Sequence, residues 1–182
     1  MINKLKNKKV SKCLLCSNKK LKKIFNLGNF YVSNFVTKKN IRKGNVKCPL
    51  NLLFCKNCTL IQLSHIAPQE LMYRRFYWYK SGVTKTMRDG LKELYIASLK
   101  HIKLEKKDTV LDIGANDGTL LKYYQKNYTT IGCEPAKNLI KSLKKNCKFV
   151  LDNFWSYKNL YKIIKDNDIQ KPKIITAIGM FY

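Results

Sequence analysis

An apolar strand that ends in an acid and leads into a glycine turn constrains this 182-residue chain more than any other feature. In Val110-Leu-Asp-Ile-Gly-Ala-Asn-Asp-Gly118, Asp112 lies near the end of a strand candidate, and Gly114 and Gly118 bracket a turn into a helix. Glycines permit tight turns and let a ligand lie directly against the backbone. The run therefore predicts the first strand and first helix of a parallel α/β sheet.

The sequence that follows alternates between strand and helix patterns. Strand candidates and helix candidates of this length, in alternation, indicate βαβ units and a parallel sheet. The expected strands are 109–113, 129–133, 149–151 and 173–178, and the expected helices are 119–126, 136–145 and 156–165.

The glycine turn predicts a cofactor site at the ends of these strands. The glycines are four residues apart and follow an acid, which differs from the G-x-G-x-x-G of dinucleotide binders and suits the methionine half of S-adenosylmethionine. We expect Asp112 near its ammonium group, Glu134 on the ribose hydroxyls, and Asp152 and Asn153 near the adenine. NAD remains the alternative, since an acid also binds its ribose. The candidate cofactor residues are Asp112, Gly114, Asn116, Asp117, Gly118, Glu134, Asp152 and Asn153.

Two CxxC pairs near the N-terminus predict a structural zinc site. Cys13 with Cys16 and Cys55 with Cys58 can each supply two corners of a ZnS₄ tetrahedron, and neighbouring lysines favour their thiolate form. Two redox dithiols or four buried structural cysteines are the alternatives. Cys48 is a spare cysteine, and Cys133 and Cys147 are expected to be ordinary buried residues. The expected metal ligands are Cys13, Cys16, Cys55 and Cys58.

Composition and charge along the chain indicate where the domains lie and which partners to expect. We expect a loop-rich zinc-binding domain over 1–66 with turns at Gly28, Asn29 and Gly44, a helical aromatic connector over 67–106, and the parallel sheet over 107–182. The net charge of +26 suits nucleic acid, but the lysines are spread along the chain, so we expect no nucleic-acid partner. No run approaches the ~20 apolar residues that span a bilayer. We expect a cytoplasmic protein with no membrane partner.

The ordered set of motifs resembles the sugar C-methyltransferases that act on TDP-linked deoxysugars. The matching segments are Cys13-x-x-Cys16, 26–28, 49–50, 54–63, 77–82, 86–88, 110–121 and 134–138. The resemblance implies a zinc-binding N-terminal domain followed by a partial Rossmann-like sheet of the class I methyltransferase type, truncated after the fourth strand. It also implies zinc on the four cysteines and S-adenosylmethionine at 110–118 with Glu134.

The same resemblance implies a reaction. In such enzymes a base removes a proton beside the sugar ketone, and the carbanion attacks the methyl group of the cofactor. The aromatic segment would reach the active site, with Tyr77 or Tyr79 near the sugar; an interdomain core is the alternative for these rings. We therefore expect a methyltransferase acting on a nucleotide-linked sugar, or an incomplete copy of one. A zinc-ribbon nucleic-acid methyltransferase and a non-catalytic remnant that binds zinc and cofactor are the alternatives.

Overall fold

The computed structural model describes residues 6–32 and 46–180. Its contacts divide the chain into two units, Met1–Met72 and Tyr73–Tyr182, each of which is described by itself. Gly44, expected in a turn, lies outside the described residues. Among the residues that are described, no helix has both the length and the apolar character that crossing a bilayer requires.

The first unit contains more strand than the expected loop-rich module. Strands β2 (Leu21–Tyr31), β3 (Lys47–Cys55) and β4 (Ile61–Leu63) form an antiparallel sheet in that order, and β1 (Lys8–Lys9) pairs with β5 (His65–Ile66).

Gly28 and Asn29, expected in a turn, instead lie within β2. The pairing of β2 with β3 shifts register between Asn26 and Asn29, and Gly28 has a φ of 93° there. The Gly28 N–H donates to Asn26 Oδ1 at 2.9 Å. Glycine tolerates this left-handed backbone, so the chain forms a bulge and the strand continues beyond it.

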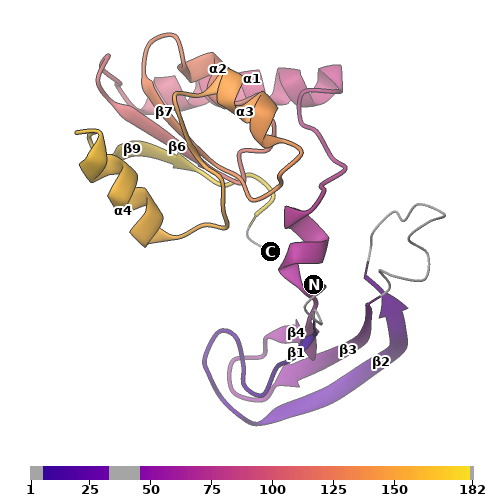
Figure 1. The fold of residues 1–182 in the computed structure, drawn as a ribbon. Coiled ribbons are helices and arrows are strands. Elements are labelled where there is room, and N and C mark those ends of the chain that lie inside the picture. Colours follow the sequence, from indigo (N-terminus) through magenta and orange to yellow (C-terminus); the bar gives the residue numbers. More distant parts are fainter. Residues whose placement is uncertain (1–5, 33–45, 181–182) are drawn as a thin grey trace, which may run out of the picture. The chain divides into compact units, whose positions relative to one another are not determined.

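The second unit is built on a parallel sheet, as the strand and helix alternation predicted. Strands β6 (Thr109–Ile113), β7 (Thr129–Cys133), β8 (Phe149–Leu151) and β9 (Pro172–Thr176) lie in the order β8-β7-β6-β9 (Figure 1). All three pairings are parallel. The predicted fold class, a zinc-type N-terminal module followed by a partial Rossmann-like α/β sheet, is confirmed.

Helices cover both faces of this sheet. Helices α1 (Lys85–His101), α2 (Leu121–Tyr124) and α3 (Ile140–Asn146) contribute to a core with Val110 and Ile174 on one face. Helix α4 (Tyr157–Asp166) packs through Leu160 against Leu111 and Ile131 on the other face (Figure 1). Because strand residues alternate between faces, both sides of β6 are apolar, and all five of its residues are buried.

The expected helical connector over 67–106 is only partly helical. A short π-helix, η2, spans Glu70–Arg74, and α1 begins at Lys85, where Thr84 Oγ1 accepts a hydrogen bond from the Met87 N–H at 3.3 Å. Residues 75–84 between them form no helix or strand, so the prediction of a helix through the aromatic residues was wrong. Their backbone groups bind side chains of the sheet unit instead, as described below.

Candidate metal centre and cofactor site

The four cysteines of the two CxxC pairs lie together in the first unit. Their sulfur atoms all lie within 4.8 Å of one another, with Cys13 Sγ 3.5 Å from Cys58 Sγ and Cys16 Sγ 3.6 Å from Cys55 Sγ. A tetrahedral ZnS₄ centre with Zn–S bonds of about 2.3 Å requires sulfur–sulfur distances of about 3.8 Å. The donor set and its spacing therefore fit zinc.

Both cysteine turns have the same local geometry. The Ser17 N–H donates to the Cys13 carbonyl at 3.0 Å, and the Thr59 N–H donates to the Cys55 carbonyl at 2.9 Å. Ser17 and Thr59 each directly follow the second cysteine of their pair, and both have a φ near 60° (60° and 61°). Each turn thus directs two sulfur atoms toward the same point.

Buried polar contacts connect the first turn to the sheet. Gln62 on β4 is 7% exposed, and its Oε1 accepts a hydrogen bond from the Leu14 N–H at 2.9 Å.

A hydrogen bond from the Asn18 backbone N–H is the main reason that the pKa of Cys16 is lowered to about 6, which favours the thiolate. The other cysteines, Cys48, Cys133 and Cys147, are not among the clustered four.

Glu134 lies buried at the carboxyl end of the sheet in the second unit. It directly follows β7, is 5% exposed, and accepts hydrogen bonds from the backbone N–H of Asn116 at 2.9 Å and of Ala136 at 2.8 Å. Burial is the main cause that raises its pKa, and the two N–H groups oppose that shift. One carboxylate therefore connects the loop after β6 with the loop after β7.

Asp112 occupies the neighbouring strand. It is 4% exposed, and Thr176 Oγ1 on β9 donates to its Oδ1 at 2.7 Å. Burial raises the pKa of Asp112 to about 7, with nearby Glu134 adding to the shift. A cationic group bound beside it would favour the carboxylate form, which is the chemistry expected for the ammonium group of the cofactor.

The two glycines of the turn have different surroundings. Gly114 has a φ of 75°, and a Cβ there would overlap the side chain of Met180. The space over this glycine, where a cofactor would lie against the backbone, thus holds a flexible thioether side chain. A Cβ at Gly118 would lie 2.7 Å from Asn146 Cβ and 3.0 Å from Leu143 Cδ1, so close packing of α3 already requires this glycine.

The remaining predicted residues follow β6 and β8 at the same edge. Asn116, at a φ of 53°, and Asp117 bind the backbone of residues 79–82 through their side chains. Asp152 and Asn153 follow β8 and are exposed. Their part in cofactor binding stays a prediction.

The two tyrosines implied by the resemblance are held beside this edge by their backbones. Tyr77 is bonded to Asn138, and the Tyr79 carbonyl accepts from Asn116 Nδ2 at 3.1 Å. The side chain of Tyr79 is 46% exposed. Sequence reasoning did not single out Asn138 or Met180; Asn138 stands inside the 134–138 motif, but its type alone did not indicate what it would bind.

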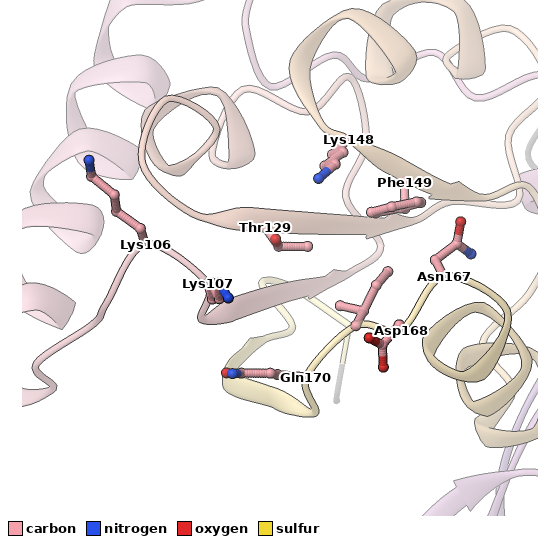
Figure 2. Close-up of a pocket in the computed structure, with 9 residues that line it drawn as sticks. Lys106, Lys107, Thr129, Lys148, Phe149, Asn167, Asp168 and Gln170 are labelled. Carbon is pink, nitrogen blue, oxygen red and sulfur yellow. The ribbon is translucent and has the colours of Figure 1, made fainter.

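A shallow hollow of about 600 Å³ lies at the opposite edge of the sheet. Figure 2 shows Lys106, Lys107, Thr129, Lys148 and Phe149 around it, which precede or begin β6, β7 and β8. Ligands of open parallel sheets bind outside the carboxyl ends of the strands. By that rule, a ligand of this sheet is expected at the Gly114–Glu134 edge and not in this hollow.

Known proteins have similarity to this chain that agrees with the expected zinc-binding and methyltransferase parts. Residues 13–73 match the Methyltransf_13 family, which is described as a putative zinc binding domain. The C-methyltransferase NovU of Streptomyces niveus is 22% identical over 132 residues, which make up 71% of this chain and 31% of that protein. The chain thus spans under a third of the curated relative that it matches. The cysteine module thus matches a zinc-binding family and holds a four-cysteine cluster that fits zinc, and the chain has distant, partial similarity to a C-methyltransferase.

Proposed function

We propose that the sheet unit binds S-adenosylmethionine at the carboxyl ends of β6, β7 and β8, and that the protein serves C-methylation of a nucleotide-linked sugar. The observation that carries the proposal is the buried Glu134 carboxylate beside the Gly114 turn. Each of its oxygens accepts one backbone N–H, and each retains a second lone pair for a ribose hydroxyl. The zinc module has a structural part, because four cysteines close the coordination sphere.

Residues of this chain would divide the cofactor between them. Glu134 would accept hydrogen bonds from the ribose, Asp112 would neutralise the ammonium group, and Gly114 would lie against the methionine chain once Met180 moves aside. When bound, the cofactor would supply an electrophilic methyl group to a sugar carbon from which a base has removed a proton, and S-adenosylhomocysteine would be the leaving group. Tyr77 and Tyr79 are proposed to lie beside the sugar.

Calorimetric titration of the full chain with S-adenosylhomocysteine tests the cofactor site. We expect binding that weakens at least about tenfold in Glu134→Gln, because hydrogen bonds to a charged group contribute about 1.5–3 kcal/mol each. The matched control is Glu93→Gln on the exposed side of α1, which should bind as the wild type does.

A ligand analogue separates ribose recognition from a general effect on the loop. The 2′-deoxy analogue should bind the wild type more weakly than S-adenosylhomocysteine, and this difference should shrink in Glu134→Gln. If the wild type and Glu134→Gln prefer S-adenosylhomocysteine over the 2′-deoxy analogue by the same factor, Glu134 does not bind the ribose. The absence of binding to the wild type would refute the proposed function.

A further inference from the structure

Residues 74–82, which we call the strap, cross the carboxyl edge of the sheet and contact the loop after each of three strands. At the first contact, Arg74 Nη1 donates to Asn153 Oδ1 beyond β8 at 2.9 Å. At the second, the Lys137 N–H beyond β7 donates to the Arg74 carbonyl at 3.0 Å. The start of the strap is thus bonded to two loops of the candidate cofactor site.

Asn138 binds the middle of the strap through both ends of its amide. Its Oδ1 accepts from the Tyr77 N–H at 2.9 Å, and its Nδ2 donates to the Tyr77 carbonyl at 2.9 Å. This pair satisfies the donor and the acceptor of one residue, as a neighbouring strand would. A side chain therefore replaces the strand pairing that residues 75–84 lack.

The end of the strap is bonded to the glycine turn after β6. Asn116 accepts from the Ser81 N–H at 3.0 Å and donates to the Tyr79 carbonyl, while Asp117 Oδ2 accepts from the Gly82 N–H at 2.9 Å. The backbone N–H of Asn116 donates to Glu134. Hydrogen bonds thus run continuously from the buried carboxylate to the strap.

We propose that the strap orders as one unit on the cofactor loops, and that Asn138 is the positioning residue that controls this order without touching the cofactor. A ligand that binds Glu134 stabilises the loop that carries Asn116, and the ordered strap in turn strengthens ligand binding, because such coupling is reciprocal. The coupling rests on the function proposed above. The anchoring by Asn138 does not depend on it.

Amide hydrogen exchange of the full chain, followed residue by residue by NMR, tests the anchoring. In Asn138→Ala the N–H groups of Tyr77, Ser81 and Gly82 should exchange about ten times faster or more, since two net hydrogen bonds of about 1 kcal/mol each are lost. The amides of β6 should keep their wild-type rates. Asn167→Ala is the matched control, because Asn167 also bonds a backbone carbonyl, that of Ile163, at the end of α4.

A second variant removes the other end of the anchoring. Asn116→Gly deletes the side-chain bonds to Tyr79 and Ser81, and glycine accepts the φ of 53° at this position without strain. It should also speed exchange across the strap, including at Tyr77, if the strap orders as one unit. If exchange becomes faster at Ser81 alone, the strap does not order as a single cooperative unit.

The cofactor arm of the test uses S-adenosylhomocysteine as the probe. Saturating probe should slow exchange of the strap amides in the wild type, and Asn138→Ala should bind the probe several-fold more weakly. If the strap amides of Asn138→Ala exchange at the wild-type rates, or if the amides of β6 are accelerated equally, the anchoring is overturned. Unchanged probe affinity in that variant overturns the coupling, whereas a wild type that binds no probe refutes the proposed function and leaves the exchange result to decide the anchoring.

Discussion

Replacing Cys55 by Ser should release the metal and unfold the first unit while the second unit stays folded. Among the described residues of Met1–Met72, the buried apolar side chains are Val10, Cys13, Cys55 and Leu71. Two of these four are ligands of the proposed zinc. Little apolar burial therefore remains to stabilise this unit without the metal.

The magnitudes support a large effect. Burying Val10 and Leu71 contributes about 1.5–3 kcal/mol each, whereas ordering the backbone costs about 1–2 kcal/mol for every residue of the unit. A structural zinc ion contributes about 10–16 kcal/mol in zinc-finger peptides. Loss of the ion should thus remove most of what holds β2, β3 and β4 together.

The assay measures zinc per chain by elemental analysis and strand content by far-ultraviolet circular dichroism. The wild type should carry one zinc ion, and Cys55→Ser should carry none and lose strand signal, as should the wild type treated with a chelator. Cys48→Ser is the matched control, because Cys48 lies on β3 outside the cluster. Zinc retained in Cys55→Ser, or lost equally in Cys48→Ser, would refute the assignment of the ligands.

Three further predictions concern the sheet unit. Asp112→Asn should be more stable than the wild type near pH 8 and about equally stable near pH 4. The pKa of Asp112 is raised to about 7, so the stability that its protonated form contributes is lost as the pH rises from about 4 to 7. If urea denaturation gives the same difference in unfolding free energy between the two proteins at both pH values, the pKa of Asp112 is not raised. Met180→Ala should bind S-adenosylhomocysteine more tightly by calorimetry, because it clears the space over Gly114, and weaker binding would show that Met180 is no obstacle. Gly82→Ala should lower the free energy of unfolding by about 1–3 kcal/mol, since its Cβ would lie 2.7 Å from Thr119 Oγ1. Gly90→Ala should raise it by about 1 kcal/mol through helix propensity, because its Cβ would have nothing within 4 Å. Shifts of the melting temperature with the same sign in both variants would refute this contrast.

The parallel strands could be predicted closely because their pattern depends on local burial. The expected bounds 109–113, 129–133 and 149–151 are those observed for β6, β7 and β8. Each is a short apolar run ended by a polar or glycine-containing turn. The helix expected over 119–126 spans only Leu121–Tyr124. At its start, Thr119 is bonded through its backbone and its hydroxyl to Asp117 and so belongs to the preceding turn.

The strap could not be predicted because nothing local encodes it. Asn138 and Tyr77 are 61 residues apart, and their bonds join a side chain to a backbone. Such contacts leave no periodicity in the sequence, and the spacing of the aromatic residues wrongly predicts a helix. The four cysteines, by contrast, could be assigned from sequence, because two turns of CxxC spacing leave few chemical alternatives.

The measurement that tests the central claim most directly is an NMR titration of the labelled full chain with S-adenosylhomocysteine. We predict that the largest shifts fall on the backbone amides of 112–118 and Glu134, at the carboxyl ends of the strands. Shifts centred instead on Thr129, Lys148 and Phe149, around the hollow at the amino ends, would contradict the site, as would a spectrum that the ligand leaves unchanged.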